Sequence, residues 1–226
     1  MMIRTLIAAV CLAAAPALAQ DGPKASFDCK KAATPVERAI CDAPHAAELD
    51  RALDELYKAA LAKAGARRGE IEAQQRQWLA RRNTGCGRAK PDAACIETLY
   101  KQRIVALARI ARGAGGPFVS GRYAYRQKGE GGEMFLAELP DGKTLVQIET
   151  VNVGHRSPHN CSFMERLTPA NGVLRHADAD ASKSCTLEIA VTGNRAVMRE
   201  SPKDCLELAQ HFCGAHGYML GTYVRK

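Results

Sequence analysis

Eight of the nine cysteines constrain the fold of this 226-residue chain most strongly, because they form two sets of four. An even number of cysteines in an exported chain indicates a disulfide framework. Four cysteines allow three pairings in each set, and their spacing alone does not choose among them. Each bridge stabilises a domain near 100 residues by about 2–4 kcal/mol, chiefly by restricting the unfolded chain. We therefore expect two parts, closed by Cys29, Cys41, Cys86 and Cys95 in the first and by Cys161, Cys185, Cys205 and Cys213 in the second.

Export is expected from residues 1–19, which have an early positive charge, an apolar stretch and the sequence Ala-Leu-Ala before Gln20. This pattern is typical of a secretory signal peptide, and its cleavage removes the ninth cysteine, Cys11. A lipid anchor at Cys11 is the alternative, but lipid attachment favours a small residue directly before the cysteine, and Val10 occupies that position. No later apolar run approaches the roughly 20 residues that a membrane span needs. We expect a bacterial protein that is periplasmic or secreted, with no transmembrane segment in the mature chain.

The first half of the mature chain has a helical pattern, which ends at a Gly- and Pro-rich linker over residues 113–117. Thr34 and Glu37 form a capping box around Pro35, so a short helix is expected from there to about Cys41. Apolar residues at three- and four-residue spacing predict three further helices. These are expected from Pro44 to about residue 64, over 69–83, and from behind the cap Asp92 to about residue 110.

The second half, residues 118–226, changes to the alternation of β-strands. Strands over 134–139 and 144–151 flank a Pro-Asp-Gly turn and predict a hairpin, and Gly-containing turns recur further on. Gly121-Arg122-Tyr123 is echoed by Gly221-Thr222-Tyr223, which we interpret as first and last strands that pair to close the sheet. The fold class is therefore α+β: a disulfide-stapled helical bundle of residues 25–112 followed by a small antiparallel β-barrel or sandwich.

The expected positions of the helices favour one disulfide pairing in the first half. Cys86 and Cys95 flank the loop between the third and fourth helices, at the end of the bundle where the second helix starts. Bridges from there to the N-terminal segment would tie it to the far side of the bundle. We therefore favour the pairs Cys29–Cys86 and Cys41–Cys95, and in the second half Cys161–Cys185 and Cys205–Cys213.

Positive charge is concentrated in the first half. Residues 20–112 hold 18 Lys or Arg against 12 Asp or Glu, a net +6, whereas residues 113–226 hold 13 against 12, a net +1. Such a surface attracts anionic partners, for example envelope polymers, in a salt-dependent way. The alternative is a solvated basic surface that only aids solubility. Nucleic acid is not expected as a partner, because the chain is exported and its single Trp78 offers no stacking platform.

The first half also resembles a known family over about residues 25–112, the N-terminal domain of the LprI-type lysozyme inhibitors. The resemblance implies an exported, helical, disulfide-bonded module that binds lysozyme and protects a bacterial envelope. The second half resembles no family securely. The resemblance rests on the four cysteines and on Phe27-Asp28-Cys29, Ala33-Thr34-Pro35-Val36-Glu37, Ile40-Cys41, Leu49-Asp50, Tyr57, Gln75 with Trp78-Leu79, Arg82, Cys86, Cys95, Tyr100 and Arg103-Ile104.

An inhibitor of this kind meets an electrostatic objection, because animal-type lysozymes are basic and a half with net charge +6 repels them. A local acidic patch of Asp50, Asp54 and Glu55 on the second helix could still dock. The alternative is that these carboxylates solvate the helix and pair with neighbouring cations. The remaining candidate binding residues are Arg81 and Arg88.

Four further side chains of the first half are expected to be structural. Trp78 and Tyr100 could anchor an interface, but at helical spacing such residues more often lie in the core. Arg82 and Arg103 fall on inward-leaning positions, where they could pair with Asp50 or Glu37.

Catalytic motifs are not found in the sequence. It has no Cys-x-x-Cys pair, no Gly-x-Ser-x-Gly elbow and no phosphate-binding loop, and its spacing picks out no carboxylate pair for glycoside hydrolysis. His211, Cys213, His216, His155 and His159 could suggest zinc, but Cys213 is expected in a disulfide. We expect no enzyme activity, cofactor or metal. The sequence predicts a binding protein, either an inhibitor of a muramidase or a basic module that binds anionic envelope glycan or acts as a scaffold.

Overall fold

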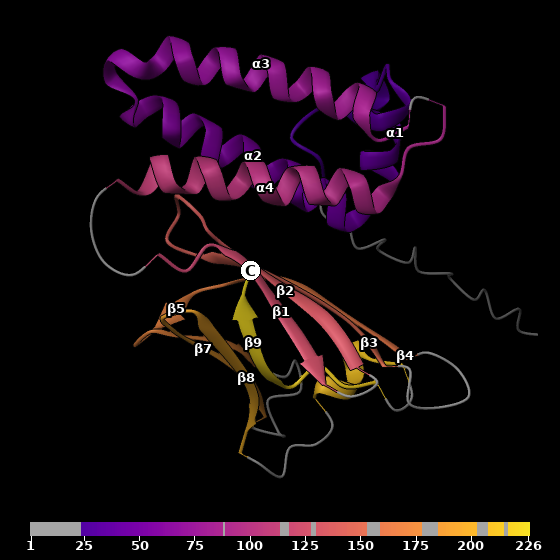
Figure 1. The fold of residues 1–226 in the computed structure, drawn as a ribbon, viewed down its shortest axis with the longest axis vertical. Helices are drawn as coiled ribbons and strands as arrows, with labels where there is room; N and C mark the ends of the chain where they lie inside the picture. Colours follow the sequence, from indigo (N-terminus) through magenta and orange to yellow (C-terminus); the bar gives the residue numbers. More distant parts are fainter. Residues whose placement is uncertain are drawn as a thin grey trace, which may run out of the picture.

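A helical layer lies against a curled antiparallel β-sheet (Figure 1). The computed structural model describes residues 24–87, 89–113, 118–127, 130–152, 159–177, 185–202, 208–214 and 217–226. The expected signal peptide and most of the expected linker lie outside these residues. The α+β fold class and the order of helices before strands are confirmed.

The helices follow the local signals of the sequence closely. Thr34 and Glu37 form the predicted capping box, since each side chain accepts a hydrogen bond from the other residue's backbone N–H. Asp92 caps the last helix by accepting from the Cys95 N–H. The helices are η1 (Cys29–Lys31), α1 (Pro35–Asp42), α2 (Pro44–Lys63), η2 (Gly65–Arg67), α3 (Arg68–Gly85) and α4 (Ala93–Arg112).

The sheet has nine strands in the order β4-β3-β2-β1-β9-β8-β7-β6-β5. The predicted pairing of the first and last strands is confirmed, because Tyr123 lies opposite Arg225. This pair joins two meanders in the middle of the order and does not cover the sheet's edges, which are β4 and β5. The strands are β1 (Gly121–Gln127), β2 (Glu130–Glu138), β3 (Thr144–Asn152), β4 (His159–Leu167), β5 (Pro169–Ala170), β6 (Val173–Ala177), β7 (Thr186–Thr192), β8 (Arg195–Ser201) and β9 (Gly221–Arg225); a short helix, η4 (Ala209–Phe212), precedes β9.

Curling brings the edge strand β4 back towards β6. The carboxylate of Glu165 on β4 lies 2.6 Å from the imidazole of His176 on β6. Phe163 of β4 packs edge-on against the same imidazole and against Phe212. These contacts hold the sheet in a half-barrel around an apolar interior.

Strands β2 and β3 take part in two cores, because successive side chains point to opposite faces of a strand. Met134, Leu136 and Ile148 face the interior of the curl, where Tyr123 and Tyr223 are also fully buried. The intervening residues face the helices and join the same core as Trp78, Tyr100 and the apolar side of α2; they are Phe135, Ala137 and Leu145. One core therefore lies between the helical layer and the sheet, and the other fills the interior of the curl.

The disulfides correct the expected pairing. Cys29 pairs with Cys41 and Cys86 with Cys95, so the favoured long-range bridges Cys29–Cys86 and Cys41–Cys95 are wrong. Each observed bridge closes a local loop, one between η1 and α1 and one between the end of α3 and the first turn of α4.

In the second half Cys161 of β4 pairs with Cys213, so the favoured pairs Cys161–Cys185 and Cys205–Cys213 are wrong as well. Cys185 is also disulfide-bonded, and Cys205 lies outside the described residues. The physical reason is the curl of the sheet, which places the segment before β9 beside the edge strand β4.

Candidate functional site

Asp50 lies inside the helical layer and not on an exposed acidic patch. It is 5% exposed, and one carboxylate oxygen accepts from the Tyr100 hydroxyl at 2.7 Å. The other oxygen accepts from the backbone N–H and the hydroxyl of Ser26, at 2.7 and 2.6 Å. Asp50 therefore ties the N-terminal segment to α2 and α4. Burial is the largest cause that raises the pKa of Tyr100 above its usual value.

Arg82 is the buried cation of this network, as the sequence predicts. Its guanidinium donates to the Tyr100 hydroxyl at 2.9 Å and lies 3.9 Å from Asp50 and 3.8 Å from Glu37. Trp78 packs edge-on against Tyr100, so both aromatic residues are core residues. Arg103 pairs with neither acid and donates to Gln75 instead.

The other candidate binding residues are dispersed. Asp54 pairs with Lys58 one turn along α2 at 2.7 Å. Glu55 accepts two hydrogen bonds from Arg166 of β4. Arg81 is exposed on α3, and Arg88 lies outside the described residues. Asp50, Asp54 and Glu55 therefore do not form one free acidic surface.

Helix α3 lies on the side of the helical layer that is farther from the sheet (Figure 1). Residues Ile71, Gln75, Trp78 and Arg82 turn inward. The outward and flanking sides present Arg76, Gln77, Ala80, Arg81 and Thr84, all exposed, together with Leu79, which is 36% exposed.

The faces of α2 and α4 that meet the sheet are occupied by ion pairs. Arg166 of β4 binds both Glu48 and Glu55 of α2. Lys101 of α4 is 6% exposed and lies 3.4 Å from Glu97 and 3.6 Å from Glu133 of β2. These charges belong to the contact between the two layers and are not available to a partner.

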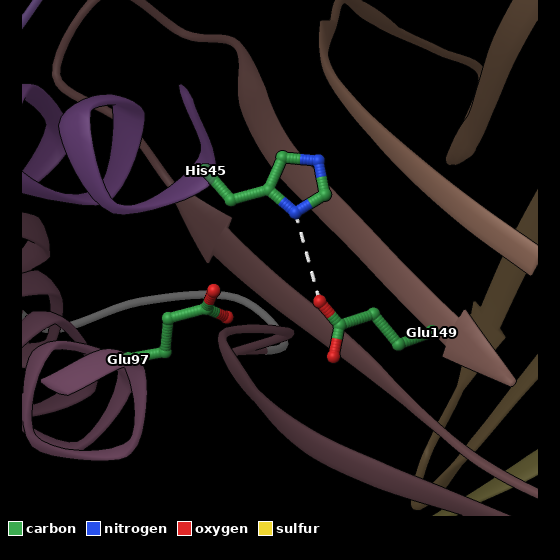
Figure 2. A group of neighbouring side chains, drawn as sticks. All are labelled: His45, Glu97 and Glu149. Atoms are coloured by element: carbon green, nitrogen blue, oxygen red, sulfur yellow. Dashed lines mark ion pairs between the residues drawn. The ribbon is translucent and has the colours of Figure 1, made fainter. Parts of the chain in front are cut away.

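A cluster of potential metal ligands lies at the edge of this contact (Figure 2). It consists of His45 at the start of α2, Glu97 of α4 and Glu149 of β3, whose ligand atoms all lie within 4.8 Å of one another. His45 Nδ1 and a Glu149 oxygen are 3.6 Å apart. The neighbouring His45 imidazole is the largest cause that lowers the pKa of Glu149.

A mostly apolar cavity of about 400 Å³ lies between the ends of α2 and α4 and the β2–β3 turn. Its apolar lining includes Leu56, Ala108 and Leu174, and Lys63 and Arg112 also border it. The cavity offers apolar contact and no cluster of reactive groups.

Comparison with known proteins bears on the helical half. Residues 29–107 match the family model described as "Lysozyme inhibitor LprI". The chain is also 32% identical over 109 residues to "Lipoprotein LprI" from Mycobacterium bovis (strain ATCC BAA-935 / AF2122/97) and from two strains of Mycobacterium tuberculosis, CDC 1551 / Oshkosh and ATCC 25618 / H37Rv. The aligned segment is 47% of this chain and 53% of each relative, so the chain spans about half the length of the curated relatives it matches.

These comparisons confirm that the N-terminal half resembles the LprI family. No solved structure matches the chain. Among the described residues, no helix combines the length and the apolar character that crossing a membrane requires.

Proposed function

We propose that this chain is an exported envelope protein that inhibits a lysozyme-type muramidase by binding it. The observation that carries the proposal is the match of residues 29–107 to a family described as a lysozyme inhibitor. The signal-like segment over residues 1–19 and the disulfides support a periplasmic or secreted location. The protein acts by occluding its target and not by catalysis.

The exposed side of α3 is the best candidate for the inhibitory face. The faces of α2 and α4 that meet the sheet are engaged through Arg166 and Lys101, whereas α3 lies on the far side of the layer (Figure 1). Arg81 is exposed there, and the described contacts give it no hydrogen-bond or ion-pair partner.

The chemistry of the target suits a guanidinium at this position. Glycoside hydrolases of this kind place two carboxylates across the scissile bond. An arginine side chain matches carboxylate geometry with two parallel hydrogen bonds. Arg81 in the cleft would therefore be held by short-range attraction, although the net positive charge of the mature chain still slows the approach to a basic lysozyme.

The test is inhibition of cell-wall lysis by several lysozyme types, with the full, oxidised protein. We expect stoichiometric inhibition of at least one type. Arg81→Glu should abolish it, whereas Arg195→Glu, the same charge change on an exposed residue of β8, should leave it intact.

The possible results test the proposed inhibition and its assignment to α3 separately. No inhibition of any lysozyme type overturns the proposed function. Inhibition that survives Arg81→Glu keeps the function and refutes the assignment to α3. Equal weakening by both variants, relieved by added salt, would mean that net charge and not a local contact governs binding.

A further inference from the structure

We propose that His45, Glu97 and Glu149 form a binding site for one divalent transition-metal ion, with Zn²⁺ the best match. One imidazole and two carboxylates form a donor set that such ions accept. The three residues come from α2, α4 and β3, so a bound ion would link the helical layer to the sheet (Figure 2). The inference does not depend on lysozyme inhibition.

The ligand atoms are already close to coordinating positions. In tetrahedral zinc sites the bonds to nitrogen and oxygen are about 2.0–2.2 Å, which places ligand atoms about 3.3–3.5 Å apart. The three atoms here lie within 4.8 Å of one another, and His45 and Glu149 are 3.6 Å apart. Small rotations of two glutamate side chains would close the site without moving the backbone.

The amide of Gln147 shows that these atoms converge on one point. Gln147 Nε2 lies 2.8 Å from a Glu97 oxygen, 2.8 Å from a Glu149 oxygen and 3.5 Å from His45 Nδ1. The N–H groups therefore occupy the position that a cation bound by the same three atoms would take. Without an ion, this amide keeps the two carboxylates together.

Gln147 also has one unsatisfied polar atom beside the site. Its side chain is 1% exposed, and its oxygen Oε1 is buried with no hydrogen-bond partner. Such an orphaned acceptor is costly. Rotation of the amide about its last bond exchanges oxygen and nitrogen. The oxygen, which now points away from the three ligand atoms, would then face them as a fourth donor to a bound cation, and the N–H groups would take its present place.

The surrounding charges permit an additional cation. Lys101 lies 3.4 Å from Glu97, but it also contacts Glu133, so the ammonium has a second acid to hold it. A carboxylate oxygen has more than one acceptor position, so Glu97 can bind Lys101 and an ion together. His45 and Glu149 are 31% and 47% exposed as side chains, which gives an ion a route from solvent.

The test uses the full, oxidised protein, stripped with a chelator and titrated with Zn²⁺ by calorimetry. We expect one ion per chain. His45→Ala and Glu149→Gln should each weaken binding by about tenfold or more, because loss of even an outer partner of a metal ligand costs about 10–100-fold. His211→Ala removes an exposed histidine elsewhere and should leave affinity unchanged.

A second measurement covers the possibility that a variant misfolds. In the unaltered protein, Zn²⁺ should shift the Nδ1 resonance of His45 in imidazole ¹⁵N spectra and leave that of His176 in place. Absence of stoichiometric binding, or binding that His211→Ala weakens while His45→Ala does not, would overturn the proposal. A zinc-induced shift confined to other histidines would overturn it as well.

Discussion

Asp50→Asn should destabilise the protein far more than Asp54→Asn, although both remove one carboxylate charge from α2. Asn has nearly the shape of Asp, so the Tyr100 hydroxyl keeps an acceptor. The substitution removes the negative charge beside Arg82, which lies 3.9 Å away, and both side chains are almost completely buried. Asp54 instead pairs at the surface with Lys58.

The magnitude follows from the fate of Arg82. Removing one partner of a buried ion pair costs about 3–5 kcal/mol, because the other charge stays buried. Glu37, 3.8 Å from the same guanidinium, compensates in part. The oxygen that accepts from Ser26 becomes an NH2 group in Asn, which cannot accept, so both hydrogen bonds from Ser26 are also lost. We therefore expect Asp50→Asn to lower the free energy of unfolding by about 3 kcal/mol.

The assay is urea unfolding of the oxidised protein at pH 7, followed by fluorescence of Trp78, which lies beside Tyr100 and is the only tryptophan. Asp54→Asn should leave the midpoint unchanged within error, because exposed helix pairs contribute little. If Asp50→Asn is as stable as Asp54→Asn, the network of Asp50, Tyr100 and Arg82 does not stabilise the helical layer and our reasoning is wrong.

Three further predictions concern the sheet and its contact with the helices. Burial raises the pKa of Glu133, but hydrogen bonds from Arg122 and Lys226 together lower it by more than burial raises it. The pKa of Glu133 is therefore below the usual 4.5. A carboxylate whose pKa is lower in the folded than in the unfolded state stabilises the fold at any pH above its unfolded-state pKa. This stabilisation is lost as the pH falls through the folded-state pKa. Unfolding free energy should therefore hold between pH 7 and 5 and fall below about pH 4.5, less steeply in Glu133→Gln. Gly221→Ala should lower the free energy of unfolding by about 1–3 kcal/mol, because φ is +136° and a Cβ would lie 2.9 Å from the buried Tyr125 ring. The control Gly121→Ala, whose Cβ would have no atom nearer than 3.7 Å, should be nearly neutral in the same unfolding assay. Phe135→Ala should cost about 3–5 kcal/mol and shift Trp78 fluorescence and the far-ultraviolet signal of the strands together; separate transitions would contradict a shared core.

The helical layer could be predicted because its signals are local. A capping box needs only Thr34 and Glu37 at the right spacing, and the apolar stripe of α2 repeats within one segment. The inward positions of Trp78 and Arg82 follow from the same 3.6-residue period. Periodicity does not say what Arg103 bonds, which depends on the polar residues that α3 presents to it.

The disulfides could not be predicted because pairing depends on loop geometry and not on helix order. Cys29 lies in η1 and Cys41 at the end of α1, 12 residues apart, and the fold places η1 beside the end of this short helix. We expected bridges to span the bundle because Cys86 and Cys95 flank the loop at the end of the bundle where the second helix starts. Both bridges of the helical half are instead local, whereas Cys161–Cys213 joins residues 52 positions apart.

The residues that join the helical layer to the sheet could not be predicted from the sequence. Glu48, Glu97 and Lys101 alternate with apolar residues along their helices, which is also the pattern of a solvated helix surface. Their partners follow far along the chain, on strands whose outward faces have the same polar pattern. Only the packing of layers shows that Arg166 and Gln147 meet them.

The charges of the helical layer have partners outside the part of the chain that resembles the family. Glu48, Glu97 and Lys101 lie within the matched residues 29–107, whereas Arg166, Gln147 and Glu133 lie outside them. A buried or half-buried charge that loses its partner is costly. The helical layer of this chain is therefore matched to its own sheet. A related helical module without such a sheet must solvate these positions, replace them or meet them with another surface. We therefore expect a binding face shared with such a module to lie on the side of the layer away from the sheet, as we propose for α3.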